Sequence, residues 1–395
     1  MQPIEWSGFC VGGRAFSWCL IFCTDQNCHR VIARNICSLP YAQKMQDKQT
    51  ELRNKREPGE LELVSQIRRR ARGGAGSGLR LGIGDDCALL RTRAGEELAV
   101  TTDLSVAGRH FELAWHPPEA VGHRTLARGL SDLAAMGAYP VAAFLSLALP
   151  PELTRHPRRL AARQAASWLD GFLDGFLALA RAYKTPLAGG DLAQAPIAAA
   201  DIVLIGAVPR GRALLRSGAR PGDVLYVTGS IGGAAAGLDL LGKLASGSSR
   251  GRGRPLHIPA ELATRLSSHL HPQPRVPQGL WLMRRGLATA AIDLSDGLST
   301  DLAHLCEESG VAAEVDATRL PIHFAATLEQ ALHGGEDYEL LFTAPQSARL
   351  PRSIAGVPVT PIGRIVRRRK GRPQVALSSV RGATPLKAGG WEHFS

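Results

Sequence analysis

Residues 291–302 read AIDLSDGLSTDL, and this stretch indicates both the fold class and the place of a candidate site. Its apolar beginning, residues 290–293, predicts a short buried strand that ends at Asp293. Residues 298–309 have the apolar spacing of a helix, and the turn between them carries a second carboxylate, Asp296. A strand, an acidic turn and a helix in this order are typical of α/β proteins, which bind ligands at the ends of strands.

Other acidic side chains recur in the same local setting. Each of them except Asp132, which is predicted inside a helix, lies at or beside a predicted strand end, often next to glycine. The set comprises Asp85, Asp86, Asp103, Asp132, Asp191, Asp293, Asp296, Glu336 and Asp337. A single Gly-Asp pair is more often a turn than a ligand site. Because so many occur in one chain, we interpret them together as oxygen ligands for magnesium, which usually shares its coordination with substrate phosphates.

The chain has 395 residues, which favours two domains. We expect a first α/β domain over residues 59–208 and a second over 209–395. Helices are predicted at 61–71, 117–136, 157–183, 234–241 and 298–309. Strands are predicted at 79–83, 87–90, 98–102, 141–149, 187–188, 202–208, 224–228, 290–293, 312–315, 338–342 and 359–362.

Residues 1–58 differ from the rest in composition, because five of the seven cysteines fall there. We expect a disordered extension outside the fold. The alternatives are translated sequence upstream of a start such as Met45, or a small metal-binding module, although the cysteine spacing fits no ligand pattern well. The two remaining cysteines, Cys87 and Cys306, are typical of a reduced, cytoplasmic protein, and Cys306 is predicted to be inert core.

The net charge favours an anionic partner. Against 35 Asp and Glu the chain has 47 Lys and Arg, a formal charge of +12. The basic runs at 68–70 and 367–370 are interpreted as solvated faces. A nucleic-acid-binding protein is the alternative from another class, but aromatic residues make up only 5% and no recognition module occurs. No apolar stretch reaches the ~18 residues needed to span a bilayer. We therefore expect neither a nucleic-acid nor a membrane partner.

Eight stretches carry a resemblance to a known family, and they occur in the family's order. They are LGIGDDCALL (81–90), TTDLSVAGRHF (101–111), LSDLAAMGAYP (130–140), AGGD (188–191), GRALLRSGARPGD (211–223), AIDLSDGLSTDL (291–302), GGEDYELLFT (334–343) and GWEHF (390–394). The chain resembles the thiamine-monophosphate kinases, in the superfamily of aminoimidazole ribonucleotide synthetase. The last two stretches are the most specific.

The resemblance implies a two-domain α/β fold in which the N-terminal sheets of a homodimer close into a barrel-like core. It also implies phosphorylation of thiamine monophosphate by ATP, the last step of thiamine diphosphate biosynthesis, with several magnesium ions. The magnesium ligands would be Asp86, Thr101, Thr102, Asp103, Asp132, Asp191 and Asp293, with Asp296 holding a further ion. Nucleotide contacts would be Gly190, Asp191, Arg216 and Ser295. Contacts to thiamine monophosphate would be His110, Glu336 and Trp391.

Three positions depart from the family pattern. Leu192 stands where Thr usually follows Gly-Gly-Asp, Arg128-Gly129 stands where the helix usually carries Asn, and Trp391 stands where Tyr is common. The first two departures bear on nucleotide or metal contacts. Taken alone, His110 is more often a loop histidine than a ligand contact, and Trp391 is as often a packing residue.

The acceptor in this reaction is itself a phosphate, whose second pKa of about 6 leaves it largely a dianion at neutral pH. No general base is then needed, and we expect direct in-line transfer without a phosphoenzyme. The nearest alternative is a sister enzyme that activates a carbonyl, carbamoyl or selenide acceptor. A hydrogenase-maturation relative would end in Cys, whereas this chain ends in Ser395. A selenide-activating relative would carry Cys in a Gly-rich loop, whereas Cys87 lies inside a predicted strand.

Overall fold

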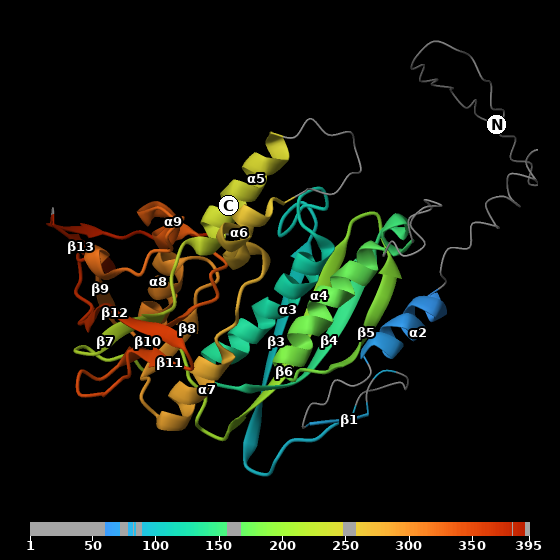
Figure 1. The fold of residues 1–395 in the computed structure, drawn as a ribbon. Coiled ribbons are helices and arrows are strands. Elements are labelled where there is room, and N and C mark those ends of the chain that lie inside the picture. The colour runs from blue at the N-terminus through green and yellow to red at the C-terminus, as the bar shows by residue number, and fades with distance from the viewer. Residues whose placement is uncertain are drawn as a thin grey trace, which may run out of the picture. The chain divides into compact units, whose positions relative to one another are not determined.

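The computed structural model describes residues 60–71, 78–81, 83, 89–155, 167–247, 258–380 and 382–391 (Figure 1). The chain separates into two units, residues 1–56 and 57–395, and all described residues belong to the second. The predictions for residues 1–58 and for Asp85, Asp86 and Cys87 therefore lie outside the described residues. None of the described helices is long and apolar enough to cross a membrane.

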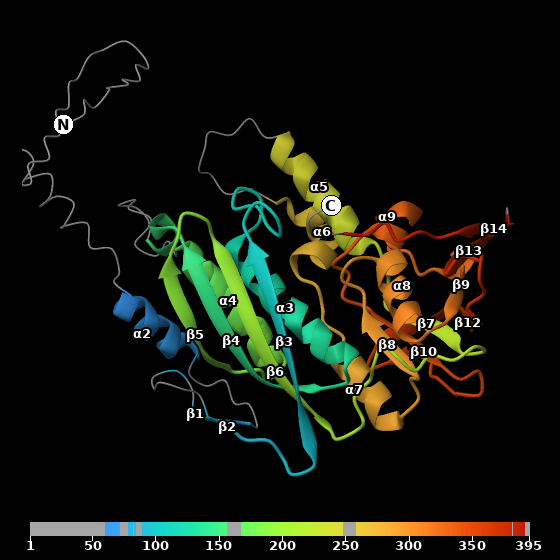
Figure 2. The ribbon, with the colours of Figure 1, turned by 180° about the vertical axis from the view of Figure 1, so that it is seen from behind.

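The first sheet has four strands in the order β3-β6-β4-β5, and only β4 and β5 run parallel. The strands are β3 (Glu96–Val106), β4 (Tyr139–Leu149), β5 (Leu187–Gln194) and β6 (Ala199–Pro209). Helices α3 (Pro118–Ala135) and α4 (Trp168–Ala182) lie against one face of this sheet (Figure 2). The other face carries exposed apolar side chains on β3, namely Leu98, Val100 and Leu104.

The second sheet has eight strands, in the order β14-β13-β9-β12-β7-β10-β8 with β11 beside β12. They are β7 (Val224–Thr228), β8 (Ala290–Asp293), β9 (Ala312–Asp316), β10 (Leu340–Ala344), β11 (Ser353–Ile354), β12 (Val357–Val366), β13 (Val375–Ser379) and β14 (Gly382–Pro385). The helices that follow in this half are α5 (Gly233–Ser246), α6 (Ala263–Leu270), α7 (Val276–Arg285), α8 (Leu298–Glu308) and α9 (Leu328–His333). Both of these sheets are open, so the fold is a mixed α/β fold with two main sheets.

The remaining described elements lie outside the two main sheets and the helices named above. They are α2 (Glu60–Ala71), β1 (Leu79–Leu81), β2 (Leu89–Leu90) and the 3₁₀ turns η3 (Pro151–Thr154), η4 (Ala260–Leu262) and η5 (Ala317–Arg319). Strands β1 and β2 pair antiparallel. Buried Cys306 on α8 belongs to the core of the second sheet, and burial raises the pKa of its thiol to about 12, which confirms its prediction as inert core.

Helix α3 lies at the centre of the described fold, and most of its residues are buried. It packs on β3 and β6 of the first sheet, on α4 and α7, and on β8 of the second sheet (Figure 1). Glycines allow these close crossings. A Cβ at Gly175 of α4 would lie 1.8 Å from the Glu119 carbonyl oxygen, and one at Gly279 of α7 would lie 1.9 Å from that of Ala134. The small residues therefore bring the helix backbones into direct contact.

The sequence predicted the ends of α3 to within about one residue, because Pro118 lies at its first turn and Gly137 follows its end with φ of 65°. The prediction that Asp103 and Asp191 lie at strand ends is wrong, because both lie inside β3 and β5, which pairing with β6 and β4 extends. Of the helix predicted over 157–183, the structure describes α4 from Trp168, where Ser167 and Asp170 form a capping box. Residues 157–166 lie outside the described residues.

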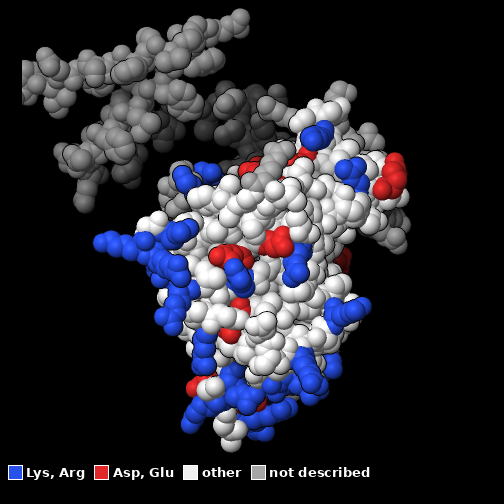
Figure 3. All heavy atoms as spheres, turned by 90° about the vertical axis from the view of Figure 1, so that its left-hand side faces the viewer, with Lys and Arg blue, Asp and Glu red and all other residues white. Residues whose placement is uncertain are grey.

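The basic run at 367–370 follows β12 and is fully exposed, as predicted for a solvated face. Figure 3 shows Lys and Arg gathered along one edge and the lower part of the face that it draws. In the other run, Arg68 and Arg69 are exposed, but the interpretation is wrong for Arg70. Its guanidinium donates 2.7 Å to Asp170 and also pairs with Asp174, so it ties α2 to α4.

We predict that Gly175→Ala destabilises the protein. The added Cβ meets backbone on α3, so the two helices must separate, at a cost of about 1–3 kcal/mol in the free energy of unfolding. Urea unfolding measures this. Gly242→Ala on α5 is the matched control, since the nearest atom to its Cβ is 3.8 Å away. It should be neutral or about 0.5–1 kcal/mol stabilising. Equal stability of the two variants would contradict the close crossing.

Candidate functional site

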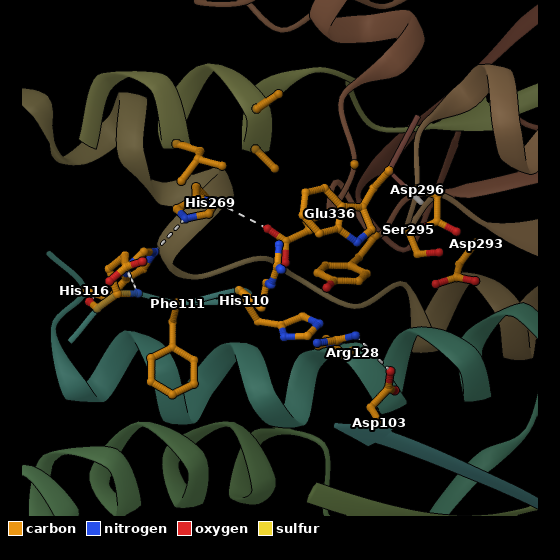
Figure 4. A pocket seen from close by; sticks show the side chains of 18 of the residues that line it. Asp103, His110, Phe111, His116, Arg128, His269, Asp293, Ser295, Asp296 and Glu336 are labelled. Atoms are coloured by element: carbon orange, nitrogen blue, oxygen red, sulfur yellow. Dashed lines mark hydrogen bonds and ion pairs between the residues drawn. The ribbon is translucent and has the colours of Figure 1, made fainter. Parts of the chain in front are cut away.

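A cavity of about 490 Å³ lies where α3, the first sheet and the second half of the chain meet (Figure 4). It is lined by Asp103 of β3, by Arg128 and Asp132 of α3, and by a long loop between β3 and α3. From the second half come α5, α6 and the loops that follow β8 and precede β10. Segments up to nearly 300 residues apart along the chain thus share one cavity, whose ends differ in chemistry.

One end of the cavity is acidic. Asp103, Asp132, Asp293 and Asp296 line it together with Ser295, so the structure brings five of the predicted site residues together. Local contacts hold these carboxylates. Thr101 Oγ1 donates a hydrogen bond to Asp132, and Ser131 Oγ donates to Asp293 Oδ2 at 2.6 Å. Two adjacent residues of α3 therefore contact both sheets, because Asp132 accepts from Thr101 of β3 and Ser131 donates to Asp293 of β8.

Burial makes the charged forms of these carboxylates unfavourable. It raises the pKa of Asp103 to about 6 and raises the pKa of Asp132. It raises the pKa of Asp293 further, and repulsion from Asp132 adds to the effect. Asp103 Oδ2 is buried and has no hydrogen-bond partner among the described residues. Like charges held together without water are stabilised by a cation between them.

These residues fit a magnesium ion that is shared with phosphates. Within the described residues, no three His, Cys, Asp or Glu side chains converge to hold a metal ion by themselves. The donors at the acidic end are oxygens only, and one buried carboxylate oxygen has no partner. Magnesium prefers oxygen, and it is commonly bound through one or two carboxylates plus substrate phosphates and water.

The other predicted metal and nucleotide residues are not all at this end. Thr102 is exposed, and its side chain lies on the opposite face of β3 from Asp103. Gly190 and Asp191 line a separate, mainly apolar cavity of about 240 Å³ beside α2, β4 and β5. Arg216 is exposed but close enough for its charge to offset part of the rise that burial causes in the pKa of Asp132 and Asp293. Asp86 lies outside the described residues.

The rest of the cavity, here called its aromatic end, contains the predicted residues His110, Glu336 and Trp391. Trp391 is half-exposed, and its backbone N–H donates to the Asp296 carbonyl oxygen at 3.1 Å. His110 Nδ1 accepts from the Val106 N–H at 3.1 Å. Glu336 has a φ of 69°, a left-handed conformation that is uncommon outside glycine. Such strain persists only where surrounding contacts hold it.

Those contacts come from Arg124 of α3, which sequence reasoning missed. Its Nη2 donates to both carboxylate oxygens of Glu336 at 2.7 Å and to the His110 carbonyl oxygen at 3.2 Å. Its Nη1 contacts His116 and His269, whose Nε2 atoms lie 3.0 Å apart. Burial, reinforced by the Arg124 charge, lowers the pKa of His116 to about 4 and that of His269 well below its usual value.

Both rings are therefore neutral at pH 7. Although His269 Nδ1 lies 3.7 Å from Glu336 Oε2, this contact is not an ion pair. Arg124 is the cation that balances Glu336. A sequence signal for it does exist. Arg124, Arg128 and Asp132 recur every four residues on α3, which places three charges on one face of a buried helix.

Two further acids are structural. Asp337, which belongs to the predicted set, is buried and accepts backbone N–H groups of Gly232 and Ala234 at the start of α5. Burial raises its pKa to about 7. Asp301, which the sequence did not indicate, accepts three consecutive N–H groups from residues 295–297. It thereby fixes the loop that presents Ser295 and Asp296 to the cavity.

Comparisons with known proteins identify the family. Residues 84–213 match the family described as AIR synthase related protein, N-terminal domain, and residues 220–376 match the corresponding C-terminal domain. The thiamine-monophosphate kinase of Salmonella typhimurium is 40% identical over 328 residues, which cover 80% of this chain and 92% of that protein.

Solved structures give the same result. The crystal structure of thiamine-monophosphate kinase from Stenotrophomonas maltophilia has a TM-score of 0.65 at 38% identity, covering 80% of this chain and 95% of that one. The protein called AaThiL, solved in complex with AMPPCP and TMP, has a TM-score of 0.62 at 30% identity and covers 86% and 98%.

We predict that Mg²⁺ raises the melting temperature of the wild-type protein and that Asp132→Asn removes most of this increase. A ligand at 100 times its dissociation constant stabilises a fold by about 2.7 kcal/mol. Without Mg²⁺ the variant should be at least as stable as wild type, because a neutral amide replaces a carboxylate whose pKa burial has raised. Thermal unfolding with and without Mg²⁺ measures both effects.

The control for this measurement is Asp239→Asn, an exposed position on α5. This variant should show the same Mg²⁺-induced rise in melting temperature as the wild type. Equal increments in wild type and Asp132→Asn would contradict a cation site at the acidic end.

Proposed function

This chain belongs to the AIR synthase related proteins and, within them, to the thiamine-monophosphate kinases, and from this premise we propose that it transfers the terminal phosphate of ATP to thiamine monophosphate. The products are ADP and thiamine diphosphate. The observation that carries the proposal is a single cavity with buried carboxylates at one end and an aromatic, Glu336-containing end at the other. The complex of AaThiL with AMPPCP and TMP supports the same pair of ligands.

The aromatic end suits the thiamine part of the acceptor. Thiamine carries a cationic thiazolium ring and an aminopyrimidine ring. An indole face such as that of Trp391 attracts a cation by roughly 0.5–2 kcal/mol. Glu336 is held by Arg124 in one orientation, so it can accept a hydrogen bond from the amino group, and His110 lies beside it in the cavity (Figure 4). These residues bind and orient the acceptor, and Arg124 is a positioning residue.

The acidic end suits the phosphates. Asp103, Asp132, Asp293 and Asp296 would hold magnesium ions, with Thr101 as a further ligand. By motif Asp86 and Asp191 would bind metal too, but Asp191 lines the separate cavity beside β5. When bound, magnesium would supply positive charge that offsets the charge of the two phosphates. The acceptor phosphate is already largely ionised at pH 7, so the residues of the chain need not remove a proton. Their work is to align the two phosphates for direct in-line transfer.

The decisive experiment measures ADP release by the purified protein with ATP and Mg²⁺, with and without thiamine monophosphate. We expect acceptor-dependent ADP release with thiamine diphosphate as the co-product. Asp132→Asn should lower turnover by roughly two to three orders of magnitude, as the loss of other transition-state electrostatics does, while Asp239→Asn should not. ADP release only with a carbonyl, carbamoyl or selenide acceptor would withdraw the substrate assignment.

We also propose that the protein is a homodimer formed through the first sheet. β3 is an edge strand, and on its exposed face Leu98, Val100 and Leu104 are each more than half exposed. Such a face is an unpaired apolar surface that a second copy can cover. The double substitution Leu98→Glu and Val100→Glu should then give a monomer in sedimentation experiments. Val380→Glu, at another highly exposed apolar position, is the control, and a monomeric wild type would contradict the proposal.

A further inference from the structure

Arg128 occupies the middle of the cavity, between its two ends. Figure 4 shows its guanidinium between His110 and Asp103. The side chain is mostly buried, and the negative charges of Asp103, Glu336 and Asp132 all act on it. Arg128 thus faces the metal end on one side and the acceptor end on the other.

The contacts of Arg128 are long. Nη2 lies 3.3 Å from Asp103 Oδ1, and Nη1 lies 3.2 Å from Ser105 Oγ and 3.4 Å from the Leu104 carbonyl oxygen. Charge-assisted hydrogen bonds of good geometry are about 2.7–2.9 Å long. Arg124, one helical turn earlier, contrasts with it, because both of its contacts to Glu336 are 2.7 Å. Arg124 is therefore bound closely to Glu336, whereas Arg128 makes only long contacts.

The partner of Arg128 is also a proposed magnesium ligand. Asp103 Oδ1 pairs with Arg128, and its buried Oδ2 has no hydrogen-bond partner in the part of the chain that the structure describes. A divalent cation on this carboxylate would weaken its attraction for the guanidinium, since both positive charges would share one negative group. The arginine would then be available to another anion in the same cavity.

We propose that Arg128 binds the phosphate of the acceptor, once a cation has taken Asp103. This rests on the proposed function. An acceptor whose rings lie among His110, Glu336 and Trp391 extends its phosphate toward the aspartates and passes Arg128 on the way. Without Arg128 the phosphate dianion would face Glu336 and the aspartates, and Arg124 is already bound to Glu336. Arg109 also lines the cavity, but Arg128 is the arginine that contacts Asp103. A planar guanidinium fork matches two phosphate oxygens at once.

The test is calorimetric titration of thiamine monophosphate and of thiamine into wild type, Arg128→Met and Arg128→Lys, with Mg²⁺ and without nucleotide. Thiamine has the same rings without the phosphate. In Arg128→Met we expect thiamine monophosphate to bind on the order of 10- to 100-fold more weakly, the range for a lost charge-assisted contact. Thiamine should bind as well as before or better. Arg128→Lys keeps the positive charge but not the planar guanidinium. Its affinity for thiamine monophosphate should therefore lie between those of wild type and Arg128→Met.

Arg265→Met, on the exposed surface of α6, changes the net charge equally and should leave both affinities unchanged. Melting temperatures show that each variant is folded, and Arg128→Lys supplies the comparison if Arg128→Met is not. An unchanged ratio of the two affinities in the folded variants would overturn the role of Arg128 while leaving the proposed function intact. A wild-type protein that binds thiamine monophosphate no better than thiamine would overturn both.

Discussion

The close packing of α3 between the two halves of the fold is the constraint on which the rest of the site depends. Glycines on α4 and α7 allow backbone contact with this helix, so its separation from both helices is set by the backbones themselves. One face then carries Arg128 and Asp132 into the cavity and Arg124 against Glu336, while Ser131 contacts Asp293 of the second sheet. A rotation of the helix would displace all of these groups together, which explains why small residues occur at the crossings.

The same packing removes water from the carboxylates, and this gives the site its chemistry. Asp103, Asp132 and Asp293 would be ordinary surface acids if the two halves were apart. Together and buried, they have raised pKa values and repel one another. This repulsion destabilises the fold when no cation is bound, and it favours the binding of a cation between the carboxylates. At the other end, the neutral pair His116 and His269 solvates Arg124 without competing for Glu336.

The sequence alone predicts the parts of this structure that local patterns determine. Helix α3 has a proline at its start and a glycine after its end, and β8 is a short apolar run before an acidic turn, so both were placed correctly. The lengths of β3 and β5 were not, because they depend on pairing with distant strands. The four-residue spacing on α3 indicates that Arg124 shares a face with Arg128 and Asp132, but its partners His116, His269 and Glu336 are up to 220 residues apart, and no local pattern reveals them.

The departures from the family pattern can be sorted by the direction in which each residue faces. A Cβ at Gly129 would lie 2.9 Å from Ile202 Cδ1, so this position faces β6 and not the cavity. Leu192 lines the separate cavity beside β5. Neither touches the residues around the proposed acceptor. Arg128 and Trp391 are the departures that line the main cavity, and Arg128 adds a positive charge on which Asp103, Asp132 and Glu336 all act. Any difference in acceptor binding between this chain and its relatives should therefore depend on Arg128 more than on Gly129 or Leu192.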